Sequence, residues 1–488
     1  SSVLICATSA QVLDLSRPLR RTPAMSGAMQ HHVRMEQWLA EDSLVRRLNA
    51  DESLRCLRDS TVQYVPHGGT IHGAIGKMLA WNYLKVGTEE TLSAVHFLWG
   101  AQGAPDIAHG GQIASAFDHC FGHCMRAVIG VGPQFTVRLR TEFRRRAPLR
   151  RTLCCHVRVV GKEARPGKGG KDGRCKVELR AELLLPGPEG SAGDVVATSE
   201  CTFVAITDPL GLLSRHAKPF SSQLMKHNEA AERQARENPV VYDDLGRILG
   251  PMAELPYFSC RGGAARCFEA SRRWVQESAH VAWLSAQPGL QEMDLAYLRC
   301  HGGFRLNAGR WCPSDLPAQL LRELEARGEA PAAVSVTDNR VMECYFADRE
   351  RPRVVGVLRF SEAAAGPPGR THGGVVASAM DESFVWAGQH LHGGMTAWLD
   401  VSLRSAAPLQ TDLCVIVQLD RVEGSTTKGR SKVYMSARLF QPRKGAANGS
   451  VDDALAAGTL VCEATTLLVS SEDVGLWRSA ASSGGAKL

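Results

Sequence analysis

Several signatures of common protein classes are missing from this 488-residue sequence. No run approaches the roughly 18 consecutive apolar residues of a membrane-spanning helix, so no such span is expected. The 15 cysteines include no CxxC pair and follow no regular spacing, which favours free thiols in a reducing compartment over a disulfide framework. A P-loop, a GxGxxG turn after a strand and a GxSxG elbow are also missing, which argues against the nucleotide-dependent enzymes and serine hydrolases that carry them.

What is present is an ordinary globular composition. Apolar residues make up 44% and charged residues 22%, which excludes collagen, coiled coil and wholesale disorder. The 57 basic and 50 acidic side chains leave a charge of +7, too small at this length to indicate a nucleic-acid partner. The length predicts about three domains.

The two ends of the sequence differ from the rest. Residues 1–35 hold one acid, Asp14, against four arginines. This composition favours a targeting segment for a mitochondrion or another organelle, with a disordered tail of a cytoplasmic protein as the alternative. Residues 471–488 are rich in Ser, Gly and Ala and predict a disordered tail.

An internal repeat organises the chain. HGGQIASAFD at 109–118 and HGGVVASAMD at 372–381 share seven of ten positions at an offset of 263. The tripeptide HGG occurs at three further places, but none of those has an aspartate nine residues after the histidine. Two copies of one module, rather than a chance motif, are therefore predicted.

Each copy has a readable order of elements. A short strand and a Gly/Pro turn precede a helix, predicted over 112–129 and 375–389, that is apolar on most sides and therefore buried. Alternating strands follow, at 135–143, 153–160, 175–184 and 195–206 in copy 1 and at 396–403, 413–422, 432–440 and 459–469 in copy 2. A buried helix with an antiparallel sheet predicts an α+β module in which the sheet wraps the helix.

These motifs resemble those of the hotdog-fold acyl-CoA thioesterases, in the subgroup with HGG and a spaced aspartate. The stretch from Gly366 to Gly374, with Asp381 and Thr396, is the better match, and the stretch from Ala104 to Gly111 is the more divergent one. The resemblance covers roughly 92–207 and 353–470. It implies a tandem (double) hotdog in one chain, hydrolysing a fatty acyl-CoA to free acid and coenzyme A without another cofactor.

The predicted division of the chain follows from the repeat. It comprises a terminal segment, 1–35; a helical lead-in, 36–91; hotdog domain 1, 92–207; a helical insert, 208–352; hotdog domain 2, 353–470; and a tail, 471–488. Two such chains associating as a homodimer is a further expectation from the resemblance.

Candidate catalytic residues lie at and after each HGG. Gly110 and Gly373 begin a helix, where free N–H groups could stabilise an oxyanion. Asp118 and Asp381 interrupt apolar helices, where a carboxylate is uncommon unless paired or functional. The resemblance implies that each aspartate activates water or attacks the thioester, oriented by a threonine, and that it faces the glycine of the other copy. The resulting centres are Asp118 and Thr136 with Gly373, and Asp381 and Thr396 with Gly110.

The remaining candidates are expected to bind substrate. His109 and His372, each followed by a second glycine (Gly111 and Gly374), are interpreted first as residues that lock the turn. Seven arginines lie between 138 and 151, and they include Arg144, Arg145 and Arg146; Arg404 occupies the aligned stretch of copy 2. Arginine suits the three phosphate groups of coenzyme A. A charged strand edge that prevents aggregation explains the same run equally well.

A metal site and two other functions are the alternatives to this interpretation. His119 and His123 have a spacing that can hold a metal, but no third and fourth ligands follow at a diagnostic spacing, so no metal site is expected. A hotdog hydratase or dehydratase would need a catalytic histidine paired with an acid. A non-catalytic acyl-CoA-binding protein would keep the fold without the chemistry.

Overall fold

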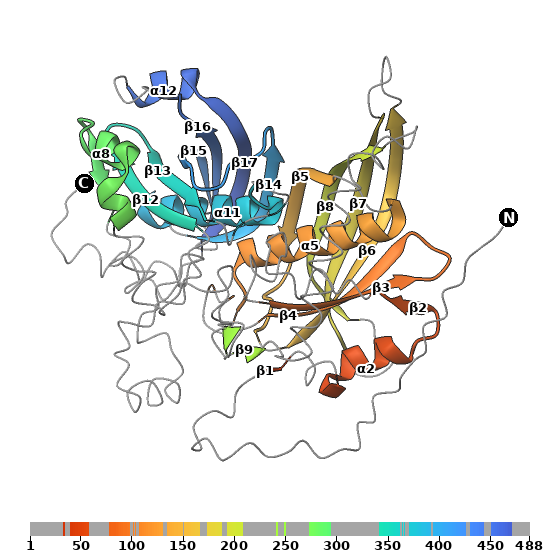
Figure 1. Cartoon of the computed structure of the whole chain (residues 1–488). Helices are drawn as coiled ribbons and strands as arrows, with labels where there is room; N and C mark the ends of the chain where they lie inside the picture. The colour runs from red at the N-terminus through yellow and green to blue at the C-terminus, as the bar shows by residue number, and fades with distance from the viewer. Residues whose placement is uncertain are drawn as a thin grey trace, which may run out of the picture.

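The fold is that of a computed structural model, which describes residues 33–34, 40–57, 78–97, 101, 103, 107–129, 134–149, 151–165, 173–187, 193–207, 241–242, 248–249, 273–293, 341–361, 364, 366, 370–391, 394–425, 430–443 and 450–470. Most of these residues belong to a single 14-stranded antiparallel sheet (Figure 1). No helix in the described part of the chain is long and apolar enough to cross a membrane. The predicted targeting segment, tail, and most of the insert lie outside the described residues.

Two modules of the same order share this sheet. Domain 1 contains β3 (Met78–Lys85), β4 (Glu90–Phe97), α5 (Gly110–Ile129), β5 (Gln134–Phe143), β6 (Thr152–Arg165), β7 (Gly173–Leu185) and β8 (Asp194–Thr207). Domain 2 contains β12 (Val341–Asp348), β13 (Arg353–Phe360), α11 (Gly373–Leu391), β14 (Met395–Leu403), β15 (Asp412–Ser425), β16 (Arg430–Gln441) and β17 (Thr459–Ser470). Both predicted helices and all eight strands predicted after them are confirmed, as is the double hotdog.

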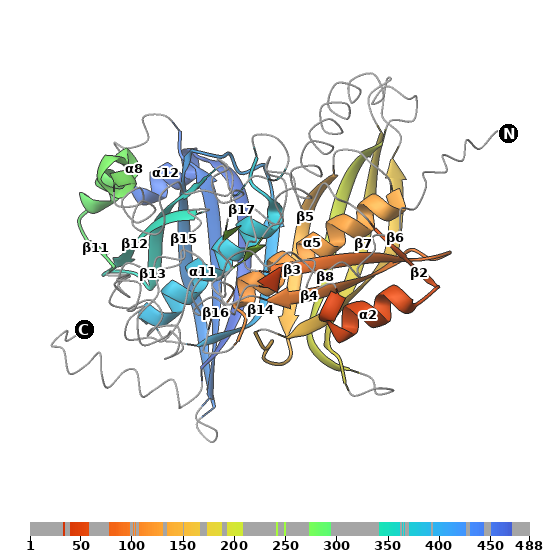
Figure 2. The same ribbon diagram turned by 60° about the horizontal axis from the view of Figure 1, so that its bottom comes forward.

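The two domains join through β5 and β14, which pair antiparallel so that Arg140 lies opposite Asp400. Each sheet curves around its own helix, and α5 and α11 approach each other near the join (Figures 1 and 2). Both helices are apolar on most sides, since they face a sheet and the partner helix at once. Their side chains and the inner faces of both sheets form one continuous core.

The expectation of a helical lead-in at 36–91 is wrong in part. One helix is present, α2 (Ser43–Ala50), but it is followed by β2 (Leu54–Cys56) and β3, so domain 1 begins at Met78. Domain 2 likewise begins at Val341, within the range assigned to the insert. The strand β3 lacks alternation because both its faces are covered: Met78 packs into the core, and on the other face Tyr83 donates a hydrogen bond to Asn49 of α2.

The repeat extends further upstream than the motif suggests. In the insert, α8 (Ala279–Ser285) precedes β11 (Leu290–Glu292), and in both copies the strand begins 11 residues after the helix begins. The helices α2 and α8 lie at opposite ends of the molecule, each over the hairpin that begins its domain (Figure 2). A helix and a short strand therefore belong to each module, and neither was predicted as part of the repeat.

The helices α2 and α8 are each fixed to their domain by a hydrogen bond between the N-cap residue and the first residue of a strand. The donor and the acceptor are exchanged between the two copies. In domain 1 the N-cap of α2 is Asp42, whose carboxylate accepts a hydrogen bond from Thr152 at the start of β6. In domain 2 the N-cap of α8 is Ser278, which donates to Asp412 at the start of β15. This contact connects a helix end to the sheet in both copies.

A substitution at this cap should be mild and local. We expect Asp42→Ala to lower the free energy of unfolding by about 1 kcal/mol, because α2 loses its N-cap. Urea denaturation measures the change. A much larger loss would mean that the carboxylate does more than cap the helix and bind Thr152.

The remaining elements are small. β1 (Val33–Arg34), β9 (Val241–Tyr242) and β10 (Ile248–Leu249) form a separate three-stranded sheet. A short helix, α12 (Val451–Ala457), precedes β17 and was not predicted. The predicted insert helices near 228–238 and 316–327 lie outside the described residues.

Candidate functional site

The two predicted aspartates lie at the interface between the domains. Asp118 is 2% exposed and Asp381 is fully buried. Each faces the first turn of the other domain's helix: a side chain at Gly374 would contact Asp118, and one at Gly110 would contact Asp381. The structure therefore brings together two composite groups of residues related by the repeat.

The Asp118 centre has both carboxylate oxygens engaged. The hydroxyl of Thr136 donates to Oδ1 at 2.7 Å, and the backbone N–H of Gly374 donates to Oδ2 at 2.6 Å. The Nδ1 atom of His372 lies 3.2 Å from the same Oδ2. The glycine predicted to face Asp118 was Gly373, but the amide in contact is that of Gly374, one residue later.

The Asp381 centre repeats half of this arrangement. Thr396 donates to Oδ1 at 2.8 Å, matching Thr136. The other oxygen, Oδ2, accepts no hydrogen bond from any described residue and lies 3.2 Å from Nδ1 of His109. A Cβ placed on Gly110 would lie 3.0 Å from this oxygen, so the first turn of α5 borders it.

The two histidines hold the turn that precedes each helix. Nδ1 of His109 accepts the N–H of Gly111, and Nδ1 of His372 accepts the N–H of Gly374, both at 3.1 Å. Burial lowers the pKa of His372, although Asp118 opposes the shift, so the neutral imidazole is favoured. A neutral ring that accepts at Nδ1 matches the turn-locking interpretation made from the sequence.

The glycines after each histidine are required by the close approach of the two helices. A Cβ on Gly111 would lie 2.7 Å from the Ser378 hydroxyl, and one on Gly374 would lie 3.0 Å from Cα of Ser115. In turn, the Ser115 hydroxyl donates to the carbonyl of Gly374 at 2.6 Å. Sequence reasoning did not single out these serines, although both stand in the repeated Ala-Ser-Ala stretch that could have revealed them.

Sequence reasoning also missed a buried carboxylate beside the site. Glu382 follows Asp381 directly, at the place that His119 holds in α5, and it is 1% exposed. Burial, with the negative charges of Glu343 and Glu382, raises the pKa of Tyr345 well above its usual value. The Tyr345 hydroxyl therefore stays protonated, and it lies 2.9 Å from that of Ser383.

Most of the predicted phosphate-binding arginines contact acids. Arg144 pairs with Glu142, Arg145 pairs with Asp194, and Arg404 pairs with Glu463. Arg146 is exposed, and no ion pair joins it to another described residue. These arginines belong to the two loops, 144–151 and 404–411, that contact the start of each helix.

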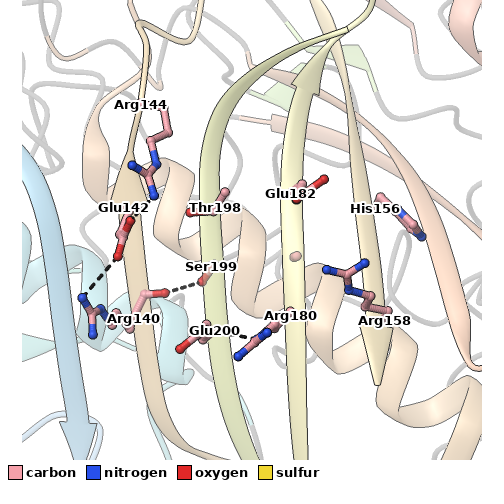
Figure 3. A pocket seen from close by; sticks show the side chains of 11 residues that line it. Arg140, Glu142, Arg144, His156, Arg158, Arg180, Glu182, Thr198, Ser199 and Glu200 are labelled. Atoms are coloured by element: carbon pink, nitrogen blue, oxygen red, sulfur yellow. Dashed lines mark hydrogen bonds and ion pairs between the residues drawn. The ribbon is translucent and has the colours of Figure 1, made fainter. Parts of the chain in front are cut away.

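A surface groove on the outer face of β5, β6, β7 and β8 is a separate feature (Figure 3). Its arginines contact neighbouring glutamates: Arg140 and Arg144 bind Glu142, and Arg180 binds Glu200. Neither buried aspartate lines it. The groove is therefore a strand surface of mixed charge. The alternative interpretation of the arginine run as a strand edge is wrong for β5, which pairs with β14 on one side and with β8 on the other.

Other reactive side chains near the helices have structural surroundings. The rings of His119 and His123 have centroids 4.5 Å apart, and among the described residues no group of three or more His, Cys, Asp and Glu is placed to hold a metal. The described cysteines are free thiols, and burial raises the pKa of Cys124 to about 12. Such a thiol stays protonated and is a poor nucleophile.

Comparisons with known proteins found a family model and a curated relative that parts of this chain match. Residues 106–164 match the family model described as Thioesterase superfamily. A 97-residue stretch, 20% of this chain, is 32% identical to acyl-coenzyme A thioesterase THEM4 of Xenopus laevis and covers 41% of it. The chain thus spans about two fifths of the length of the curated relative that it matches.

Solved structures of low sequence identity were also found. A putative thioesterase from Novosphingobium aromaticivorans is 12% identical, with 77% of this chain and 94% of that chain covered and a TM-score of 0.35. RV0216 from Mycobacterium tuberculosis, described as having a double hotdog fold, is 12% identical, with 76% and 84% covered and a TM-score of 0.35.

Proposed function

We propose that this double-hotdog chain hydrolyses acyl-CoA thioesters to a free acid and coenzyme A, and the match of residues 106–164 to the Thioesterase superfamily model supports the proposal. The observation that carries the proposal is a buried carboxylate facing the first turn of the partner domain's helix, as Asp381 faces Gly110. Neither group alone indicates hydrolysis, but a base that directly faces an amide-rich helix start suits attack on a carbonyl.

The proposed chemistry requires only the carboxylate, an N–H of the facing helix start and a water molecule. The carboxylate removes a proton from water while the water oxygen bonds to the thioester carbon. Negative charge develops on the carbonyl oxygen, where an N–H of the helix's first turn, unpaired within its own helix, stabilises it. The C–S bond then breaks, and the coenzyme A thiolate leaves and takes up the proton.

The substrate class is proposed on charge. Coenzyme A carries several phosphate groups, and the exposed Arg146 belongs to the loop that contacts the start of α5. The hydroxyls of Thr136 and Thr396 hold the carboxylates in a fixed orientation. Neither feature reports the length of the acyl chain.

A second function is favoured by one observation. Each histidine lies 3.2 Å from an aspartate, and a histidine paired with an acid is what a hotdog hydratase would use. The Nδ1 atom nearest the carboxylate already accepts a backbone N–H, which leaves it a poor proton donor. Hydrolysis therefore remains the preferred reaction.

An acyl-CoA panel tests the proposal. The purified chain should release free thiol from acyl-CoA substrates, and the Asp118→Asn/Asp381→Asn double variant should lose at least about 100-fold of kcat, because it lacks a base. Asp420→Asn, the same change at an exposed carboxylate bound to Ser436, is the matched control.

Three outcomes would contradict the proposal. Unchanged thiol release in the double variant would exclude the buried carboxylates as the base. Substrate binding with no thiol release from the wild-type chain would favour a binding protein, and hydration of an enoyl-CoA would favour the hydratase.

A further inference from the structure

We infer that the two composite centres have different roles: the chemistry takes place at Asp381, while Asp118 forms a closed contact that holds the domains together. This inference rests on the proposed function and assigns it to one of two related sites. Two independent observations carry it, one from the carboxylates and one from the charged loops beside them.

The carboxylates differ at one oxygen only. Both Oδ1 atoms accept a threonine hydroxyl at nearly the same distance, 2.7 Å at Asp118 and 2.8 Å at Asp381. At Asp118 the second oxygen already accepts a backbone N–H at 2.6 Å, so part of its hydrogen-bonding capacity is occupied. At Asp381 the second oxygen is fully buried and accepts no hydrogen bond from the described residues.

A buried carboxylate oxygen without a donor is costly unless a ligand supplies one. Water or substrate at Asp381 would provide the missing hydrogen bond, and the same oxygen is the one that would accept the proton during hydrolysis. The Asp118 oxygen has no such need, because a backbone donor satisfies it. The geometry thus distinguishes the Asp381 oxygen, which lacks a hydrogen-bond donor among the described residues, from the Asp118 oxygen, which has one.

The donor at Asp118 is itself firmly placed. The same N–H of Gly374 also contacts Nδ1 of His372, and the Gly374 carbonyl accepts the hydroxyl of Ser115 from the other domain. Three polar contacts therefore converge on the backbone of one residue, Gly374, at the start of α11. This residue joins domain 2 to domain 1, and its N–H is a poor candidate for an oxyanion donor.

The loops beside the two helix starts differ in charge. In domain 1, Ala108 donates its N–H to Ala147, and in domain 2, Thr371 donates to Ala407, both at 2.9 Å, so each loop lies against its own helix start. The domain 1 loop, residues 144–151, reads RRRAPLRR, whereas the domain 2 loop, residues 404–411, reads RSAAPLQT.

Four arginines of the first loop are therefore replaced by Ser, Ala, Gln and Thr in the second. The arginine-bearing loop contacts the start of α5, and α5 is the helix that faces Asp381. Arg146 in this loop is exposed, and its counterpart is Ala406. The Asp381 side therefore offers a nucleotide with several phosphates more cations than the side of the other aspartate, where Arg370 and Arg404 lie among the described residues.

Single variants separate the two centres. With an acyl-CoA that the wild-type chain hydrolyses, Asp381→Asn should lower kcat at least about 100-fold and Asp118→Asn at most about threefold. Two threonine variants form a milder matched pair, because they leave both carboxylates in place. Thr396→Val should lower kcat about tenfold, and Thr136→Val should have a much smaller effect. Circular dichroism establishes that each variant is folded.

The role of Arg146 in binding phosphate is tested with a truncated substrate. Arg146→Ala should raise KM for the acyl-CoA about tenfold and leave KM unchanged for the N-acetylcysteamine thioester of the same acid, which lacks phosphate. Arg404→Ala makes the same change on the other loop. Equal losses of kcat in Asp118→Asn and Asp381→Asn, or a KM effect of Arg404→Ala alone, would overturn the inference while hydrolysis stands. A wild-type chain inactive on every thioester would refute the proposed function, and the inference with it.

Discussion

Replacing Gly111 by alanine is expected to lower the free energy of unfolding by about 3 kcal/mol, because the added methyl has no room at the domain interface. It would lie 2.7 Å from the hydroxyl, 2.9 Å from Cα and 3.0 Å from the carbonyl oxygen of Ser378. Two of these atoms are backbone in the interior of α11, so the clash is relieved only by moving one helix away from the other. Urea denaturation monitored by tryptophan fluorescence measures the loss.

The same substitution at Gly122 provides the control. This glycine lies in the same helix, has no atom within 4 Å of the place where a Cβ would be, and has no positive φ. Gly122→Ala should therefore raise the free energy of unfolding by about 0.5–1 kcal/mol through helix propensity. Similar results for the two variants would mean that the helix starts are not in close contact.

The central part of each domain could be predicted from the sequence because its signals are local. Apolar residues recur around most of α5 and α11, and the strands after them alternate, so both elements were found within a few residues of their ends. The histidine, the glycines and the aspartate nine residues later were found because they occur twice. Repetition separated this motif from three other HGG tripeptides.

The outer parts of the domains gave no comparable signal. The strand β3 is buried on both faces and therefore lacks alternation, and α2 and α8 are only eight and seven residues long. Their place in the repeat depends on an 11-residue spacing rather than on identical residues. The unequal chain between β2 and β3 and between β11 and β12 conceals that correspondence.

The difference between the two aspartates could be anticipated only in part. The unequal arginine content of the two loops is visible in the sequence, but which loop serves which aspartate depends on how the domains face each other. Whether Gly374 or Gly373 contacts Asp118 depends on displacements smaller than one residue of helix rise. Such distances follow from packing, which no local pattern encodes.

The second large effect is expected at Asp412, outside the candidate site. This carboxylate is 7% exposed and accepts hydrogen bonds from Trp274, Ser278 and Arg359. It thereby fixes α8, whose Val281, Trp283 and Leu284 cover the outer face of the domain 2 sheet. We expect Asp412→Ala to lower the free energy of unfolding by about 3 kcal/mol, because two buried donors, Trp274 and Ser278, and the partly buried Arg359 lose their acceptor.

A pH series distinguishes loss of this charge from simple loss of packing. Burial alone would raise the pKa of Asp412, but hydrogen bonds from His280, Arg359, Ser278 and Trp274 together hold it well below the usual range for an aspartate. A lowered folded-state pKa gives stability that is fully present above the unfolded-state value of about 4 and is lost as pH falls toward the folded-state value. The stability difference between the wild-type chain and Asp412→Ala should therefore be constant from pH 7 to about pH 5 and shrink below about pH 4. A difference that stays constant down to pH 2.5 would show that α8 is held by its apolar contacts and not by the charge, since only the charged form of Asp412 accepts all of these hydrogen bonds.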